Sequence, residues 1–263
     1  MDLFVGTSGY NYKEWKGPFY PEKMPAKDML EFYSGQFRSV EINNSFYRVP
    51  KPDVVRNWAE TVPEGFRFVM KATRRITHFK RLKDVGEETA YFVGMANELR
   101  DRLGAILFQF PPNFKKDMER LQTFVELLPK RLPVALEFRH DSWYDDDVRD
   151  CLRGHNAALC FAHEDDDTVE QVEQRFASTA DWGYLRLRGS EYGEQEMMAW
   201  SRRVLAQDWE RAFVFFKHED EGLGPKLARA FLTAEAIQVC DLGLLVVDEE
   251  PVPDWPHWRP GSV

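Results

Sequence analysis

Short runs of β-branched and aromatic residues alternate with longer amphipathic stretches along the whole chain. The short runs predict eight strands, at residues 3–6, 39–43, 66–72, 105–110, 134–139, 157–162, 183–188 and 212–218. The stretches between them have the spacing of apolar positions that is typical of helices, at residues 28–37, 87–103, 118–128, 195–207 and 226–236. Strands separated by helices indicate βαβ units and a parallel sheet.

Eight strands in 263 residues favour a single closed (β/α)8 barrel of the TIM type. An open doubly wound sheet is the alternative. Residues 165–175 are acidic and weakly periodic, so we expect the sixth helix to be short or absent. After the last helix, residues 242–247 are apolar and residues 251–260 are rich in Pro and Trp, and residues 237–263 are predicted to form an irregular C-terminal extension. No linker or fixed repeat divides the chain, which predicts one domain over residues 1–263.

Composition narrows the class of protein. The formal net charge of −9 argues against a general affinity for nucleic acid or acidic membranes. Cys151, Cys160 and Cys240 have no C-x-x-C spacing, so neither a disulfide framework nor a zinc site is predicted. The N-terminus lacks the features of a signal peptide, and no apolar run approaches the roughly 20 residues that span a bilayer. These features predict a cytoplasmic protein without membrane contact, and they leave its oligomeric state open.

Several predicted strands become polar on one face near their C-terminal ends. Strands of a parallel barrel are covered on both faces and are normally apolar throughout. In the second strand, Glu41 and Asn43 share one face, and Val40 and Ile42 occupy the other. The same alternation gives other strands a polar face that carries Lys71, Gln109, Glu137, Arg139, Arg186 and Arg188. If the apolar faces pack on the helices, these polar side chains meet at the C-terminal mouth, where barrels build active sites.

Two interpretations of this polar set remain open. Taking a lone charge out of water costs several kcal/mol, so each buried charge needs a partner, water or a ligand. Glu41 and Glu137 could pair with the basic side chains in a salt-bridge plug that closes the top of the barrel. A functional pocket built on the same network is favoured, because Leu and Val would fill the barrel at lower cost.

Six motifs stand out at and after the strand ends. They are GTSGY at 6–10, WKGPFYP at 15–21, VEINNSFYR at 40–48, ITH at 76–78, QFPP at 109–112 and EFRHDSW at 137–143. Together they resemble the YecE-like family, and the resemblance extends from the first strand to about Phe231. The resemblance implies a TIM-barrel fold. Because the family is a domain of unknown function, it leaves the chemistry open.

The chain departs from the pattern of that family in the seventh strand. The family usually has Arg-Leu-His-Gly there, whereas this chain has RLRG at 186–189. A histidine function at this position is therefore in doubt, and Arg188 makes the mouth more basic. The eighth strand reads FFKHE at 215–219, which resembles one branch of the family, while another branch carries asparagines.

The leading hypothesis is an enzyme or binding protein for a phosphorylated, sugar-like or other anionic ligand at the mouth. Arginine suits phosphate and carboxylate because its planar fork donates two parallel hydrogen bonds. The predicted ligand-binding residues are Asn43, Tyr47, Lys71, Gln109, Arg139, Arg186, Arg188 and Lys217. The predicted general acid and base are Glu41 and Glu137, with His78 and His218 as alternatives. No cofactor motif is present, so the cofactor stays unknown.

Two rival hypotheses belong to other functional classes. One is a divalent-metal hydrolase or isomerase that uses Glu41, Glu137, His140 and Asp165, although the acidic run at 164–167 is better explained as a solvated loop. The other is a non-catalytic module that binds nucleic acid or a protein partner, which the net charge disfavours. The predicted partner is therefore a small anion, and no metal site is predicted.

Overall fold

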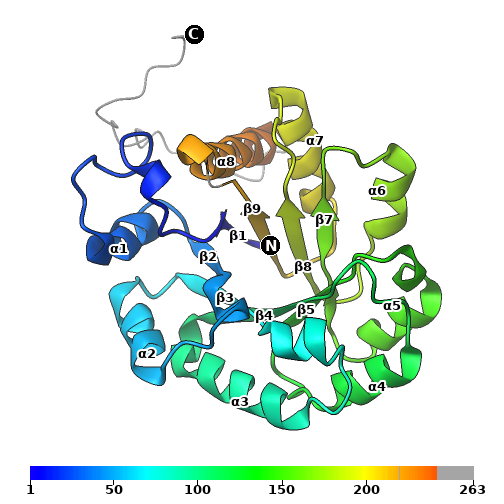
Figure 1. Cartoon of the computed structure of the whole chain (residues 1–263). Helices are drawn as coiled ribbons and strands as arrows, with labels where there is room; N and C mark the ends of the chain where they lie inside the picture. Colours follow the sequence, from blue (N-terminus) through cyan, green and yellow to red (C-terminus); the bar gives the residue numbers. More distant parts are fainter. Residues whose placement is uncertain (219, 242–263) are drawn as a thin grey trace.

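Nine parallel strands lie side by side in the computed structural model, which describes residues 1–218 and 220–241 (Figure 1). Their order in the sheet is β6-β5-β4-β3-β2-β1-β9-β8-β7. The strands are β1 (Asp2–Ser8), β2 (Ser39–Ile42), β3 (Arg67–Lys71), β4 (Leu103–Gln109), β5 (Val134–Glu137), β6 (Ala158–Leu159), β7 (Phe161–His163), β8 (Trp182–Leu187) and β9 (Arg211–Phe216).

One short segment closes the ring of strands. The predicted sixth strand, 157–162, forms both β6, which pairs with β5, and β7, which pairs with β8. Cys160 lies between them, and its backbone N–H donates to the Leu136 carbonyl at 2.9 Å. The chain thus changes its pairing partner at Cys160. The predicted (β/α)8 barrel is confirmed, with its sixth strand split in two.

In the described part of the chain, eight helices follow the strands and surround the barrel in chain order (Figure 1). They are α1 (Met29–Ser34), α2 (Pro52–Thr61), α3 (Gly86–Ala96), α4 (Met118–Glu126), α5 (Asp146–Arg153), α6 (Val169–Arg175), α7 (Glu194–Leu205) and α8 (Leu223–Asp241). Short 3-10 segments are η1 (Lys13–Trp15), η2 (Ala26–Asp28), η3 (Asn44–Phe46), η5 (Asn97–Arg102), η6 (Asp141–Trp143) and η7 (Asp220–Gly222), and η4 (Arg75–Phe79) is a π-helical turn.

The structure describes the sixth helix in full, and it describes only part of the segment that follows the last predicted helix. The sixth helix is present and short, as α6, because a capping box fixes its start. The Thr168 side chain accepts from the Gln171 N–H, and the Gln171 side chain accepts from the Thr168 N–H. The last helix, α8, continues to Asp241, so residues 237–241 are helical and not part of an irregular extension. The remainder of the predicted extension, 242–263, lies outside the described residues.

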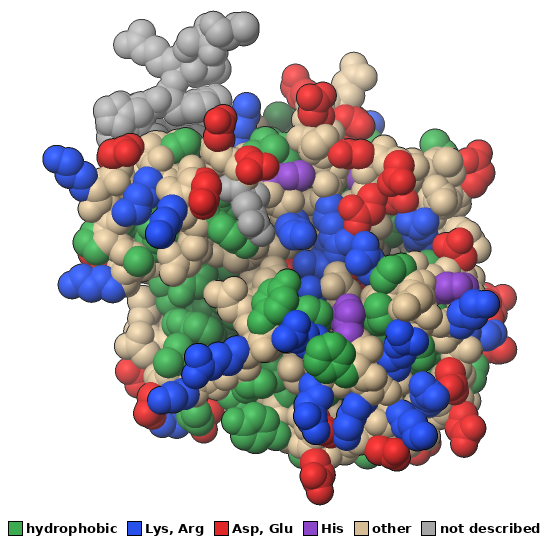
Figure 2. Space-filling model, viewed as in Figure 1, with side chains coloured by type: hydrophobic (Ala, Val, Ile, Leu, Met, Phe, Trp, Pro, Cys, Tyr) green, Lys and Arg blue, Asp and Glu red, His purple; other side chains and the backbone are tan. Residues whose placement is uncertain are grey.

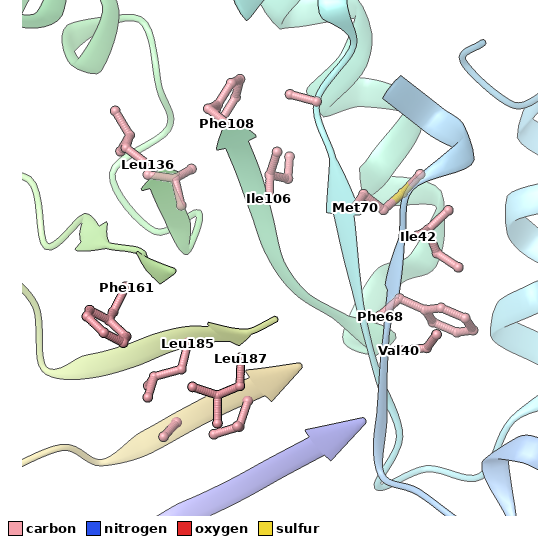
Figure 3. Packing of buried hydrophobic residues seen from close by; sticks show 14 of the residues in the cluster. Val40, Ile42, Phe68, Met70, Ile106, Phe108, Leu136, Phe161, Leu185 and Leu187 are labelled. Atoms are coloured by element: carbon pink, nitrogen blue, oxygen red, sulfur yellow. The ribbon is translucent and has the colours of Figure 1, made fainter. Parts of the chain in front are cut away.

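Adjacent residues along most of the strands enter two separate apolar cores. The larger core lies between the sheet and the helices and includes Val40, Ile42 and Phe68 (Figure 3). The smaller one fills the inside of the barrel with Phe4, Val69, Ala105, Leu107, Ala135, Ala158, Cys160, Trp182, Tyr184, Phe213 and Phe215. This division confirms that side chains alternate between the two faces of the strands, as predicted. In several strands, the inward-facing residue two positions after the smaller core lies at the mouth of the barrel.

The parts of the chain that the structure describes contain no helix that is both long and apolar enough to cross a bilayer. Cys151 and Cys160 are free thiols. The side chain of Cys240 lies outside the described part.

Candidate functional site

Glu41 is fully buried near the end of β2, and both of its carboxylate oxygens accept hydrogen bonds. Ser8 Oγ at 2.7 Å, Arg186 Nη2 at 2.8 Å and Asn43 Nδ2 at 3.1 Å donate to Oε1. The Tyr184 hydroxyl donates to Oε2 at 2.6 Å. Burial alone would raise the pKa of Glu41, but the Arg186 guanidinium and these donors outweigh it, so the pKa lies below its usual value.

Glu137, the last residue of β5, is buried in the same layer of the barrel. Gln109 Nε2 and Arg188 Nη2 donate to its Oε1 at 2.8 and 2.7 Å, and Arg186 Nη1 donates to Oε2 at 2.7 Å. Burial opposes ionisation, yet the positive charges of Arg188 and Arg186 hold the pKa of Glu137 well below its usual range. Both glutamates are therefore stable carboxylates whose lone pairs are already engaged.

The two arginines of β8 and its end are held by glutamates. Arg186 is 1 % exposed and bridges Glu41 and Glu137. Arg188 bridges Glu137 and Glu164. We call these five residues the Arg–Glu network. Among the described residues, the Nε atoms of both arginines are buried without a hydrogen-bond partner. A ligand that used either terminal fork would have to displace a carboxylate.

Lys71 is a buried cation that has no carboxylate partner among the described residues. It ends β3 on the inward face and is only 9 % exposed, and its ammonium lies 4.4 Å from the centroid of the Phe46 ring. Over the described ranges, its ammonium makes no hydrogen bond or ion pair. Burial and repulsion from Arg186 lower the pKa of Lys71 to about 8, and attraction from the two buried glutamates offsets this only in part.

His78 in η4 packs against the same phenyl ring. Its ring centroid lies 4.9 Å from that of Phe46, and its Nδ1 lies 2.9 Å from the Thr77 hydroxyl. Burial lowers the pKa of His78, and the positive charges of Lys71, Arg139 and Arg81 lower it further. These charges act on one imidazole, so we call Lys71, His78, Arg81 and Arg139 the basic rim.

The other predicted ligand-binding residues are placed less centrally. Arg139 is exposed, because β5 ends at Glu137 and the alternation of the strand does not continue. Tyr47 is 68 % exposed. The side-chain amides of Asn43 and Gln109 each donate a hydrogen bond to a glutamate of the Arg–Glu network, Glu41 and Glu137 respectively.

Lys217 and His218 follow β9. Lys217 is exposed, and the Nε2 of His218 lies 2.6 Å from the Gly189 carbonyl. His218 therefore ties the segments after β8 and β9 together, and the structure does not bring it to the predicted acid–base pair.

A cleft of about 310 Å³ opens beside the network, between the segments after β1 and β2. Its lining includes Tyr10, Tyr12, Asn43 and Trp58. Asn43 also donates to Glu41, so the wall of the cleft is connected to the Arg–Glu network. Basic side chains gather near the centre of the face shown in Figure 2, over the region of β5, β7 and β8.

The four residues of the metal hypothesis are not assembled. Within residues 1–218 and 220–241, no group of three or more His, Cys, Asp or Glu is arranged to hold a metal ion. Asp165 accepts from the Ser190 N–H, and His140 Nδ1 lies 2.9 Å from the Ser142 hydroxyl. Glu41 and Glu137 serve the arginines instead.

The predicted site residues did not include five contributors: Ser8, Phe46, Arg81, Glu164 and Tyr184. Side chains two or four positions apart in a strand share one face. This alternation indicates that Ser8 points inward with Phe4 in β1, and Tyr184 with Arg186 in β8. No local pattern indicated that Glu164, in the acidic run, would pair with an arginine after another strand.

The sequence matches one protein family along most of its length. Residues 4–249 match the family model described as "Protein of unknown function DUF72". The chain is 31 % identical over 150 residues to UPF0759 protein YunF of Bacillus subtilis, covering 54 % of this chain and 52 % of that protein. It is 31 % identical over 116 residues to UPF0759 protein YecE of Escherichia coli K12, covering 44 % and 43 %. The chain thus spans about half the length of these curated relatives.

Solved structures match over most of the chain. The crystal structure of a DUF72 family protein from Thermotoga maritima MSB8 superposes with a TM-score of 0.74 and 26 % identity, covering 89 % of this chain and 98 % of that one. A DUF72 family protein from Enterococcus faecalis V583 gives 0.72 and 20 %, covering 89 % and 95 %, which supports the fold alone.

Proposed function

The chain belongs to the DUF72 family, whose function is unknown, and we propose that the mouth of its barrel binds a small anionic ligand at the basic rim. This membership confirms the YecE-like resemblance. The observation that carries the proposal is the buried ammonium of Lys71, which has no carboxylate partner in the described part of the chain. A buried charge without a partner is costly, so its place at the mouth favours a partner from solution.

The Arg–Glu network acts as the floor of this site. Arg186 and Arg188 are matched by Glu41 and Glu137 in the interior, so their charges balance there, and Glu164 adds a partner at the edge. Fixed pairs of this kind hold neighbouring groups in place, as the supporting contacts of a preorganised site must. The glutamates therefore position the arginines, and His78 replaces them as the candidate acid and base.

The chemistry of the rim favours phosphate or carboxylate. Lys71 offers a partly desolvated point charge, and Arg139 offers an exposed guanidinium fork. The exposed ring of Tyr47 provides a surface on which a sugar can stack. A phosphorylated or carboxylated metabolite with a sugar-like body would use all three features.

A thermal-shift series tests this proposal. The full chain is heated with phosphate, sulfate, glucose 6-phosphate and a short oligonucleotide at constant ionic strength. A ligand at a hundred times its Kd adds about 2.7 kcal/mol of stability to the fold, and at roughly 2–4 °C per kcal/mol the melting temperature rises by about 5–11 °C. Lys71→Met and Arg139→Met should reduce this rise, and the exposed Lys115→Met should not.

Two results would count against a small-anion site. If no small anion shifts the melting temperature, or if the shift survives both substitutions, the mouth is a structural plug. If only the oligonucleotide binds, with an affinity that falls steeply with salt, the nucleic-acid hypothesis replaces this one.

A further inference from the structure

Lys71 and His78 contact the same phenyl ring, that of Phe46, in two different ways. The Lys71 ammonium lies 4.4 Å from the Phe46 centroid as a cation–π contact. The His78 ring meets Phe46 edge to face, at an interplanar angle of 82°. The Phe46 ring therefore contacts both an amine and an imidazole.

We propose that Lys71 is a nucleophile that forms a Schiff base with the aldehyde or ketone group of an anionic substrate, with His78 as the proton carrier. This inference rests on the proposed function, because the basic rim would hold the anionic part of the substrate. It adds a covalent reaction and narrows the substrate to a carbonyl compound that carries a carboxylate or phosphate.

The surroundings of Lys71 differ from those of ordinary ion-paired lysines. Lys80 and Lys116 are held by Glu88 and Asp145, whereas no carboxylate of the described residues lies within ion-pair distance of Lys71. A lysine becomes nucleophilic when it is desolvated or lies beside another cation, and Lys71 meets both conditions. Its amine is thus available for attack.

The protonation state agrees with this role. With a pKa of about 8, Lys71 is unprotonated at pH 7.5 far more often than a lysine with the ordinary pKa of 10.5. The charged groups that act on Lys71 are Arg186 and Arg188, which repel the ammonium, and Glu41 and Glu137, which attract it.

The reaction keeps the charge of the site constant. The Lys71 ammonium gives one proton to His78, and the neutral amine attacks the carbonyl carbon. As the C–N bond forms, the nitrogen loses one proton and the carbonyl oxygen gains one, which gives a neutral carbinolamine. The hydroxyl group then takes the proton held on His78 and leaves as water, while the nitrogen lone pair forms the C=N bond. Overall, one ammonium and one carbonyl give one iminium and one water. Because the iminium carries the same single positive charge, Glu41 and Glu137 attract it as they attract the ammonium.

His78 is placed to move the protons of these steps. Its Nδ1 faces the Thr77 hydroxyl, and over residues 1–218 and 220–241 its Nε2 makes no hydrogen bond. Its pKa lies below 6.5, so the imidazole is mostly neutral at pH 7.5 and can accept a proton before returning it. Arg139 would hold the carboxylate or phosphate of the same substrate.

Reductive trapping tests the inference on the wild-type chain. The full chain is incubated at pH 7.5 with pyruvate or dihydroxyacetone phosphate and sodium cyanoborohydride, and the alkylated lysines are identified by peptide mass spectrometry. Acetone serves as the neutral carbonyl control. We expect the initial rate of modification at Lys71 to exceed that at the exposed Lys115 at least tenfold. Acetone should show a smaller preference, and Lys71→Arg should lose this adduct while Lys115→Arg keeps it.

The role of His78 has its own readout. His78→Gln should slow trapping at Lys71 at least tenfold without changing the rate at Lys115. It should also remove the inflection below pH 6.5 that belongs to His78, and leave the rise toward pH 8 that belongs to Lys71. Equal slowing at both lysines, or no slowing, would overturn the assignment of His78.

The outcomes separate this inference from the proposed function. If phosphate stabilises the fold through Lys71 but the adduct is spread evenly over exposed lysines, the anion site stands and the Schiff base is overturned. If Lys71 is trapped with acetone as readily as with the anionic compounds, and phosphate neither shifts the melting temperature nor slows trapping, the anionic substrate class and the proposed function fail together.

Discussion

Arg186 Nη2 donates to Glu41 Oε1 at 2.8 Å across the inside of the barrel, although the two residues lie 145 positions apart in the chain. The same guanidinium binds Glu137 through Nη1 at 2.7 Å. One side chain of β8 therefore joins β2 and β5 at the level where the mouth begins. This bridge makes the Arg–Glu network the structural base on which the basic rim stands.

Removing the bridge should destabilise the whole barrel. Arg186→Met leaves two buried carboxylates without their shared cation, and breaking a buried pair in this way costs about 3–5 kcal/mol. At roughly 2–4 °C per kcal/mol, the melting temperature should fall by about 6–20 °C. The matched control is Arg153→Met, which breaks an exposed pair with Asp150 and should change stability little. Equal melting temperatures for the two variants would show that the network does not stabilise the fold.

The buried glutamates predict a loss of stability in acid. The folded pKa of Glu137 lies well below its usual 4.5, so its carboxylate stabilises the fold fully above pH 4.5. This contribution is lost as the pH falls from 4.5 through the lower folded pKa, because the unfolded chain binds the proton first. Denaturant unfolding between pH 6 and 3 should therefore show a shallower decline for Glu137→Gln than for wild type. Glu119→Gln, an exposed change on α4, should follow wild type, and a wild-type slope in Glu137→Gln would refute the assignment.

Lys71 should lower the stability of the empty protein at neutral pH. Its folded pKa of about 8 lies below 10.5, which at 1.36 kcal/mol per unit corresponds to a penalty of up to about 3 kcal/mol for the protonated form. Between pH 8 and 10.5 the unfolded chain binds more protons, so this penalty disappears as the pH rises.

Lys71→Met should therefore be more stable than wild type at pH 7 in a buffer without polyvalent anions, and the difference should shrink toward pH 10. Denaturant unfolding at both pH values measures it. A variant that is less stable than wild type at pH 7 would mean that Lys71 is a structural group.

Gly6 allows β1 to approach β2 below the mouth. A Cβ at this position would lie 1.9 Å from the Ser39 carbonyl oxygen and 2.9 Å from the Tyr33 hydroxyl, so backbone would have to move. Gly6→Ala should therefore lower the melting temperature clearly. Gly94→Ala is the matched control, because it lies in α3 with no atom within 4 Å of the new Cβ and should gain about 0.5–1 kcal/mol from helix propensity. Circular dichroism melts compare the two, and an unchanged or raised melting temperature for Gly6→Ala would contradict the close approach.

The orientation of the site could be predicted because it follows from period two in a sheet that is buried on both faces. Glu41 lies between Val40 and Ile42, and Glu137 follows Leu136, so the apolar neighbours fixed which way each glutamate points. The same rule failed for Arg139, because β5 ends at Glu137, whereas the predicted strand continued to residue 139. Beyond a strand end, the backbone no longer imposes the alternation.

The partners of each charge could not be predicted from the sequence. Which arginine meets which glutamate depends on the stagger of β2, β5 and β8 around the ring, and no local pattern encodes it. Glu164 illustrates this, because its acidic neighbours indicate a solvated loop and only the fold brings it to Arg188. That Lys71 has no carboxylate partner among the described residues also depends on the tertiary fold.

Calorimetric titration of phosphate into the wild-type chain and into Lys71→Met tests the central claim most directly. At constant ionic strength and pH 7, the account predicts saturable binding of one phosphate per chain to wild type. It predicts at least tenfold weaker binding to Lys71→Met, and unchanged binding to the Lys115→Met control. Equal dissociation constants for wild type and Lys71→Met, or no saturable binding to wild type, would contradict an anion site at the mouth of the barrel.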